Sequence, residues 1–284
     1  MECKFCSLKL TRVRKIENYL LCTSCGTFSR LSGDTQTIMV NEKLKDELKP
    51  DKLNQAQLEI VQKRIPTIDH NLLDFGCGGG KFLLLAKGVF NKVAGIEITP
   101  ESVLVAESNG ITIHRSIQKK DYTVLTFWHS LEHLPFETLK RTLDEIRTSE
   151  IKYVILSVPN AKSATLKYFG DYDSFVDVEN HTFIFSKNLL VKLFSEIDFN
   201  LYASPRILRY TLFGSIQSSI NFATKTKNQL YFVLKRGHGY RDISYFRHFL
   251  LAPLYLTLCS IFLILAFANR KKDPVINLCF ERVG

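Results

Sequence analysis

The first ten residues, Met1 to Leu10, contain no apolar run of the kind that forms the core of a secretory signal. The sequence therefore predicts a chain that stays in the cytosol, where thiols are kept reduced. In such a compartment the seven cysteines are expected to act as metal ligands before they form disulfides.

Acidic residues are scarce in the last third of the chain. Residues 201–284 hold three Asp or Glu against 12 Lys or Arg, whereas residues 1–200 hold 25 against 26. Nearly all of the formal net charge of +10 therefore lies in this third, beside the uncharged segment Leu250–Ala268. Basic side chains that flank an apolar segment are attracted to an anionic membrane surface, so we expect this end of the chain to meet a membrane.

Short apolar runs alternate with helical segments through the middle of the chain. Such alternation is typical of a parallel sheet covered by helices on both faces, with ligands beyond the carboxyl ends of the strands. At 284 residues the chain has room for one α/β domain and for additions to it. The expected strands are 72–75, 93–98, 111–114, 122–128 and 153–158, and the expected helices are 44–65, 82–87, 101–109, 136–147 and 188–197.

The first of these strands runs into a turn that contains four glycines. Gly76, Gly78, Gly79 and Gly80 allow the backbone to approach a ligand with no Cβ in the way. Glu97 follows roughly twenty positions later, at the tip of the next strand, where its carboxylate suits the hydroxyls of a ribose. The pattern predicts an adenosine-type cofactor at the carboxyl edge of the sheet; the alternative is a tight turn that binds nothing.

The spacing of the glycines narrows the kind of cofactor. A dinucleotide site has the spacing G-x-G-x-x-G, with a helix amino terminus against the pyrophosphate. Here an acid stands two residues before the first glycine, as Asp74-x-Gly76-x-Gly78-x-Gly80. A carboxylate there suits a cofactor with an ammonium group and disfavours one with phosphates. This segment resembles the D-x-G-x-G-x-G motif of class I S-adenosylmethionine-dependent methyltransferases.

A second motif, WHSLEHL at residues 128–134, stands at the end of the strand 122–128. One turn of helix would gather His129, Glu132 and His133 on one side, because they are related as i, i+3 and i+4. The segment resembles the H-x-L-E-H-L sequence of a methyltransferase subgroup that includes ubiquinone-pathway O-methyltransferases and many glycan-cluster enzymes.

Two more segments are similar to that subgroup, SVPN at 157–160 and HTFIFS at 181–186. The resemblance covers about residues 70–200 and resumes at Asp273 to Arg282, where 274–280 is the expected last strand. It implies a Rossmann-like, seven-stranded methyltransferase sheet, with S-adenosylmethionine as the cofactor.

The resemblance also implies roles for individual residues. An alcohol that attacks a sulfonium methyl group loses its proton, and a neutral imidazole can take it. His129 and His181 are the candidate bases, with His129 preferred, and a purely structural histidine is the alternative for each. Glu132 and His133 are expected to orient the loop or the cofactor, with a labile divalent ion as a lesser alternative. The candidate cofactor-binding residues are Asp74, Gly76, Gly78, Gly80, Glu97, Ser116 and Trp128.

The chain departs from this family in two places. The loop Arg115 to Asp121 lacks the acid that family members often have near the adenine, so we expect adenine contacts from the backbone of Ser116 and Ile117. Thr123 replaces an aspartate that is common at the start of the fourth strand. Neither position touches the sulfonium.

Four cysteines near the amino terminus form two C-x-x-C pairs, Cys3-x2-Cys6 and Cys22-x2-Cys25. Each pair can present two thiolates to one ion, so two pairs complete a tetrahedral structural zinc site that supplies the folding energy of a small ribbon. The ribbon is either a docking surface or a folded cap. The other three cysteines are expected to be inert.

The uncharged segment Leu250–Ala268 is long enough to span a bilayer. If 274–280 completes the sheet, however, both ends of the segment lie on the cytosolic side, and the basic residues on both flanks agree with this. We therefore expect an in-plane or re-entrant segment, bent at Pro253. A transmembrane anchor without the last strand and a buried core helix are the alternatives.

These features together predict a methyltransferase at the cytoplasmic face of a membrane, peripheral or monotopic, that O-methylates an amphiphile such as a lipid-linked sugar or glycan precursor, or a long-chain quinone or phenol. The alternatives are an RNA base methyltransferase, disfavoured because the basic excess lies at the apolar tail, and a non-catalytic scaffold for glycan-biosynthesis enzymes. The expected parts are a zinc ribbon 1–32, a linker and covering helix 33–69, a core 70–200, a membrane-associating insertion 201–272 and a last strand 273–284.

Overall fold

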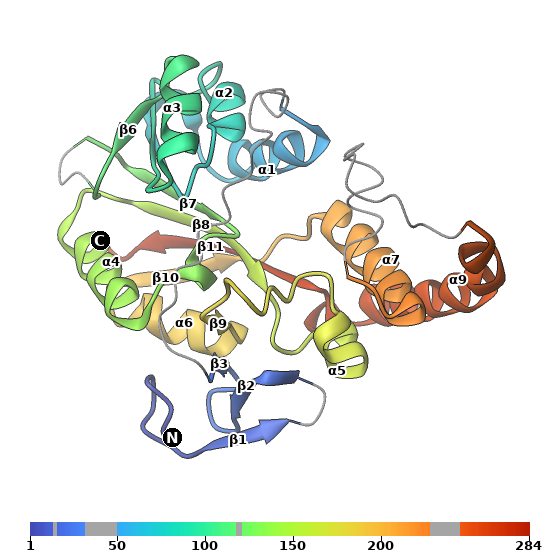
Figure 1. The fold of residues 1–284 in the computed structure, drawn as a ribbon. Helices are drawn as coiled ribbons and strands as arrows, with labels where there is room; N and C mark the ends of the chain where they lie inside the picture. The colour runs from blue at the N-terminus through green and yellow to red at the C-terminus, as the bar shows by residue number, and fades with distance from the viewer. Residues whose placement is uncertain (14–15, 32–49, 118–120, 228–244) are drawn as a thin grey trace. The chain divides into compact units, whose positions relative to one another are not determined.

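The computed structural model describes residues 1–13, 16–31, 50–117, 121–227 and 245–284 (Figure 1). The chain forms two compact units, each built from three segments. The ribbon unit comprises Met1–Gly33, Pro159–Lys187 and Leu208–Val275. The sheet unit comprises Asp34–Val158, Asn188–Ile207 and Ile276–Gly284.

The sheet unit is built on a seven-stranded sheet with the order β10-β11-β8-β7-β4-β5-β6. β8, β7, β4, β5 and β6 run parallel to one another, as the sequence predicts. Central parallel strands are covered on both faces, which is why they read as continuous apolar runs. The strands are β4 (Asn71–Phe75), β5 (Lys92–Ile96), β6 (Thr112–His114), β7 (Val124–Trp128), β8 (Tyr153–Pro159), β10 (Phe199–Ala203) and β11 (Val275–Arg282).

The last strand of the sequence, β11, completes the sheet as expected. It runs antiparallel to β8, since the N–H of Arg282 donates to Lys152 O at 2.8 Å while Asn160 N–H donates to Pro274 O at the other end. β10 pairs antiparallel with β11 and was not predicted. Phe280 of β11 stacks on Phe194 with ring centroids 4.4 Å apart, which anchors this edge in the core.

The helices of the sheet unit confirm the expected alternation, with boundaries shifted by a few residues. The expected helix 44–65 is shorter: α1 begins after Asp51, whose side chain accepts hydrogen bonds from Leu53 N and Asn54 N, and positions 44–49 lie outside the described residues. The helices are α1 (Lys52–Gln62), α2 (Lys81–Ala86), α3 (Pro100–Ser108), α4 (Phe136–Thr148) and α6 (Lys187–Ser195), with 3₁₀ turns at Thr67–Asp69 and Leu131–His133.

The ribbon unit contains a second sheet with the order β1-β2-β3-β9. β1 (Leu10–Val13) and β2 (Ile16–Cys22) pair antiparallel. β3 (Phe28–Arg30) pairs antiparallel with β9 (Phe183–Ile184), a two-residue strand from the HTFIFS segment. The ribbon therefore forms one sheet with a segment about 150 residues away in the sequence.

Among the described residues, three helices complete the ribbon unit, α5 (Ala164–Phe169), α7 (Leu208–Thr224) and α9 (Tyr245–Ala268), and Figure 1 shows α9 alongside α7. An aromatic cluster holds them together: Phe169 lies 4.8 Å from Phe222 and 4.4 Å from Phe262, measured between ring centroids. 3₁₀ turns lie at Gly170–Tyr172 and Arg270–Lys272.

α7 and α9 expose apolar side chains, which is the reverse of the usual pattern for a helix at a water-facing surface. Leu208, Leu212 and Ile216, spaced four residues apart on α7, are exposed. The buried positions of the same helix are largely polar, among them Gln217 and Asn221, which bond to each other at 2.6 Å. α9 exposes apolar side chains along its length: Leu250, Leu254, Leu256, Ile261, Ile264, Leu265 and Phe267.

Candidate functional site

The glycine turn joins β4 to α2 and holds three residues in the left-handed region. Gly76, Gly78 and Gly80 have φ values of 73°, 54° and 86°, which side chains disfavour. A Cβ on Gly76 would lie 2.5 Å from the Cβ of Ser130, so there is no room for a side chain at position 76. Among the described residues, a Cβ on Gly78 would meet nothing within 4 Å. The turn therefore leaves space at Gly78 in which a ligand can reach the backbone.

Glu97 lies directly after β5, which ends at Ile96 rather than at the expected residue 98, and lines the same turn. Its Oε2 accepts a hydrogen bond from Gly78 N–H at 2.9 Å, and its Oε1 accepts bonds from Ile98 N–H at 2.7 Å and Thr99 N–H at 2.8 Å. A carboxylate offers about four lone-pair sites, so these bonds orient the group and leave capacity for a ribose hydroxyl.

Asp74 is the buried acid of the glycine motif, in the fourth position of β4 and 3% exposed. Its Oδ1 accepts a hydrogen bond of 2.7 Å from Thr126 Oγ1 on β7. Burial raises the pKa of this carboxyl to about 7; the Thr126 bond opposes the rise and the charge of Glu97 adds to it. A nearby ammonium group would favour the ionised form and so fits this position.

The WHSLEHL motif is tied to the glycine turn by Ser130. Its hydroxyl donates to Phe75 O, the last carbonyl of β4, at 2.6 Å. Trp128, the last residue of β7, packs its ring edge-on against Phe82 of α2, 5.3 Å away between centroids. The Trp128 Nε1 is buried and has no hydrogen-bond partner within the described part of the chain. Buried donors are rarely left unpaired, which makes this N–H a candidate contact for a bound cofactor.

The same motif places an imidazole against a buried carboxylate. His129 Nδ1 lies 3.3 Å from Glu132 Oε1, and the Glu132 side chain is 0% exposed. The expectation that one helical turn would gather all three motif residues is only partly right. The 3₁₀ turn spans Leu131–His133, and His129 precedes it with φ at 56° and its N–H bonded to Ser157 O at 2.9 Å. His133 is half-buried within the turn.

The loop after β6 was expected to offer the backbone of Ser116 and Ile117 to the adenine, and the structure differs at Ile117. Ser116 is exposed, as a contact for the adenine would require. The N–H of Ile117, however, donates to Glu145 Oε2 of α4 at 3.2 Å. An acid thus reaches this loop from a helix. Positions 118–120 of the loop lie outside the described residues.

His181 belongs to the ribbon unit and is 6% exposed. Its N–H donates to Asp177 O at 2.9 Å, and Asp177 N–H lies 3.4 Å from His181 Nδ1 in donor geometry. Tyr19 of β2 donates its hydroxyl proton to His181 O at 2.8 Å. The catalytic and cofactor roles expected for His181 and for the residues of the sheet unit stay predictions.

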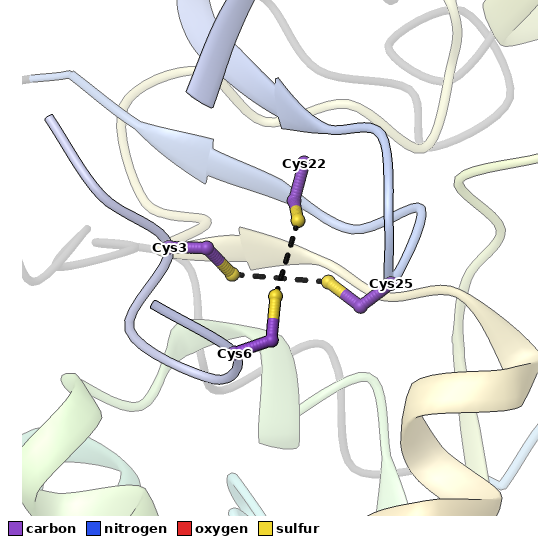
Figure 2. Close-up of side chains that lie close together, drawn as sticks. All are labelled: Cys3, Cys6, Cys22 and Cys25. Carbon is purple, nitrogen blue, oxygen red and sulfur yellow. Dashed lines mark hydrogen bonds between the residues drawn. The ribbon is translucent and has the colours of Figure 1, made fainter. Parts of the chain in front are cut away.

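The four cysteines of the ribbon converge on one point (Figure 2). Cys3 Sγ lies 3.8 Å from Cys25 Sγ, Cys6 Sγ lies 3.3 Å from Cys22 Sγ, and all four sulfurs lie within 4.8 Å of one another. Tetrahedral zinc with bonds of about 2.3 Å places its sulfur ligands about 3.8 Å apart. The geometry therefore fits the donor set that the sequence predicts.

The thiols of this cluster differ in acidity when no metal is bound. Burial raises the pKa of the Cys3 thiol to about 12. Burial also acts to raise the pKa of Cys22, but hydrogen bonds from the backbone of Cys25 and from the Cys6 side chain outweigh it and lower the value to about 7. Of these two thiols, Cys22 more readily provides a thiolate to a metal.

Comparison with known proteins identifies the sheet unit's chemistry. The family described as "Methyltransferase domain" matches residues 40–204 of this chain. A tRNA/tmRNA (uracil-C(5))-methyltransferase of Sulfurimonas denitrificans is 24% identical over 156 residues, which are 53% of this chain and 42% of that protein. A ubiquinone biosynthesis O-methyltransferase of Thiobacillus denitrificans is 31% identical over 103 residues, which are 31% of this chain and 44% of that protein.

The matches to these two relatives span less than half of each relative's length. Among solved structures, the cyclase SpnF superposes with a TM-score of 0.50 at 15% identity, covering 81% of this chain and 82% of that one, and this likeness concerns the fold alone. The family match, which includes the glycine turn and the WHSLEHL motif, shows that the chain belongs to the methyltransferase domain family and confirms the resemblance to class I S-adenosylmethionine-dependent methyltransferases.

Proposed function

We propose that the enzyme O-methylates an amphiphilic acceptor at the cytoplasmic face of a membrane, such as a lipid-linked sugar or glycan precursor. The observation that carries this proposal is α9, a helix of 24 residues that exposes many apolar side chains and no charge between Leu250 and Ala268. Its span Leu250–Ala268 is long and apolar enough to cross a membrane, and only 11% of that span is buried. A buried core helix would show the opposite, and a water-facing helix would carry charge on its outer side.

The chain around α9 favours a segment that enters the membrane without crossing it. Phe262 and Ala266 are buried on one side of the helix, and Phe262 packs on Phe169 of α5. β11 begins at Val275, a few residues after the helix ends, and belongs to the same sheet as the glycine turn. The alternative of an anchor without a last strand therefore disagrees with the fold. Peripheral or monotopic association remains our proposal.

Charge near α9 supports an anionic membrane surface as the partner. Lys271 and Lys272 follow the helix directly, and exposed Lys225 follows α7. Each basic residue near an anionic bilayer contributes roughly 1 kcal/mol of attraction. A methyltransferase that sits at a bilayer in this way is suited to an acceptor whose apolar part stays in the lipid.

S-adenosylmethionine supplies an electrophilic methyl group on a sulfonium, and its ammonium group suits the buried carboxylate of Asp74. The acceptor oxygen forms a bond to the methyl carbon as the carbon–sulfur bond breaks, which leaves S-adenosylhomocysteine. The acceptor's proton goes to His129. With Nδ1 facing the Glu132 carboxylate, the Nε2 of His129 is the nitrogen placed to take it, and Glu132 then stabilises the imidazolium.

His181 differs from His129 in the tautomer that its hydrogen bonds favour. The N–H of Asp177 points at His181 Nδ1, which requires that nitrogen to act as an acceptor and places the proton of the neutral ring on Nε2. An Nε2–H can hold an acceptor oxygen by a hydrogen bond but cannot receive its proton. This supports His129 as the base and gives His181 a binding role.

We also propose that the ribbon binds one structural zinc ion. Four thiolates fill a tetrahedral site and leave no open position, so this metal would not take part in methyl transfer. The second candidate metal role, a labile divalent ion at Glu132 and His133, is not needed by this chemistry.

An RNA acceptor is the second candidate function, because one relative is named as a tRNA/tmRNA (uracil-C(5))-methyltransferase. The exposed apolar surface of α9 has no role in that function. A third possibility is a scaffold that binds S-adenosylmethionine, recruits glycan-biosynthesis enzymes and does not turn over. It keeps cofactor binding and predicts no transfer to any fraction of the cell.

The test is a transfer assay with methyl-labelled S-adenosylmethionine and host extract separated into lipid, soluble and RNA fractions. Label should enter the lipid fraction, and His129→Ala should abolish transfer while cofactor binding persists. His70→Ala, at a histidine outside both motifs, is the matched control. Label in RNA would establish the second function instead, and binding without any transfer would establish the third.

A further inference from the structure

The segment that carries His181 is built onto the ribbon along its whole length from 177 to 186. β9 pairs with β3 through Phe28↔Ile184 and Ser29↔Phe183. Just before β9, Arg30 N–H donates to Thr182 O at 3.1 Å. β9 has only two residues, too few to be stable without a partner strand. Its conformation therefore depends on β3.

Tyr19 connects the ribbon to the turn that holds His181. It is the one aromatic residue of β2 and has 0% exposure. Its hydroxyl lies 2.8 Å from His181 O and 3.2 Å from Asp177 O, the two carbonyls at the ends of this turn. Burial raises the pKa of the phenol, so the group stays protonated and can act as a donor.

The two C-x-x-C pairs, which form two knuckles around the metal site, also contact the segment that carries His181. Ser186 Oγ donates to Cys25 O, and Ser186 N–H donates to Thr27 Oγ1 at 3.1 Å. Phe5, between the ligands Cys3 and Cys6, lies edge-on to Phe183 with centroids 5.0 Å apart. Residues of both C-x-x-C pairs thus touch the segment, one pair at Phe183 of β9 and the other at Ser186 after it.

We infer that the cysteine-bound metal acts as a positioning device for His181. The metal fixes the two knuckles, the knuckles and β3 fix residues 182–186, and Tyr19 fixes the carbonyl of His181. Loss of the metal is transmitted to His181 through these contacts, all of which lie within the ribbon unit; the Ala161 N–H also donates to Phe185 O at 3.0 Å. Tyr19 is a positioning residue in this arrangement. The inference rests on the proposed function in two respects, that the ribbon cysteines bind zinc and that His181 belongs to the acceptor site.

Hydrogen exchange of the full-length protein tests the mechanical part directly. Tyr19→Phe removes one hydroxyl and keeps the ring, so zinc content and S-adenosylmethionine affinity should stay unchanged. Backbone amides of 177–186 should exchange about fivefold faster, the scale expected for a lost buried hydrogen bond. Tyr202→Phe, on β10 of the sheet unit, is the matched control and should leave exchange of 177–186 as in the wild type.

Zinc removal by a chelator, followed by zinc addition, tests the link to the metal. Exchange should rise in both the ribbon and residues 177–186 and return to the starting values when zinc is restored. Faster exchange confined to the ribbon would overturn the inference, because the ribbon would then be a cap without influence on His181.

Transfer kinetics separate this inference from the proposed function. Tyr19→Phe should raise KM for the acceptor several-fold at unchanged affinity for S-adenosylmethionine, and His181→Ala should raise it further. Faster amide exchange at 177–186 with an unchanged KM for the acceptor would refute the positioning role, while methyl transfer would still stand. Failure of the lipid-fraction assay in the wild type would refute the proposed acceptor while the exchange results stand.

Discussion

Two helices of this chain, α4 and α9, differ in the side chains that they expose. α4 buries Leu139, Leu143 and Ile146 and carries paired charges on its outer side, such as Lys140 with Glu137 at 3.7 Å. α9 carries no charge between Leu250 and Ala268 and leaves most of that span exposed. α4 is therefore complete when it packs on its sheet in water, whereas α9 leaves an apolar surface that its own unit does not cover. The two units are therefore adapted to different surroundings, one to water and the other to an apolar environment.

The largest expected effect is on membrane binding. Replacing Leu256, Ile261 and Ile264 together by Asp should reduce binding to anionic lipid vesicles by on the order of a hundredfold, because three apolar side chains can no longer enter the lipid. Leu104→Asp, at an exposed leucine of α3 in the sheet unit, is the control and should bind as the wild type does. Vesicle sedimentation measures both. Equal losses in the two variants would remove the distinction between the helices.

The ribbon should respond to loss of its metal while the sheet unit does not. Cys22→Ser with Cys25→Ser should remove one zinc ion per chain, measured by elemental analysis, since two of four thiolates are gone. Affinity for S-adenosylmethionine should stay within about twofold of the wild type, because the glycine turn has its own core. A wild-type protein purified without metal would contradict the zinc site.

Cofactor binding should depend on Asp74 and Glu97, the two acidic residues at the glycine turn. Asp74→Ala should raise the calorimetric Kd for S-adenosylmethionine by about thirtyfold, the scale of one charge-assisted hydrogen bond. Glu97→Ala should act in the same direction. Asp144→Ala, on the exposed side of α4, is the matched control and should have no effect. Unchanged affinity in both acid variants would refute the cofactor assignment.

The smallest expected effect is a pH dependence of the same binding. The pKa of Asp74 is raised to about 7 by burial, and an ammonium ligand binds its ionised form. Affinity should therefore rise with pH through about 7, and one pH unit below this value it should be about tenfold weaker than its plateau at high pH. The sign for folding is opposite: a carboxyl with a raised pKa favours the folded state at low pH, and this contribution is lost between about 4 and 7. Asp74→Asn should flatten the binding profile.

The sequence predicts the sheet well because its signals are local. β7 and β8 are nearly continuous apolar runs, and the positive φ values of Gly76 and Gly80 are expected because glycine adopts them without steric cost. The last strand was expected from resemblance alone and is confirmed by its place beside β8.

Features that depend on distant partners could not be predicted in this way. β9 is two residues long and exists because β3 is there to pair with it. The contact of Glu145 with Ile117 joins a helix to a loop 28 positions earlier, so the loop sequence gives no sign of it. The buried polar face of α7 contradicts the usual pattern of an amphipathic helix, so its burial could not be read from its residues.

One further consequence follows from the backbone of His129. A histidine at φ 56° is in a conformation that costs a non-glycine residue about 1 kcal/mol or more, and glycine would adopt it without that cost. The chain thus carries a residue at this position that its fold alone would not choose. Selection for thermal stability without selection for turnover should replace His129 by glycine or asparagine. The strained histidine is in this sense a trade of stability for activity.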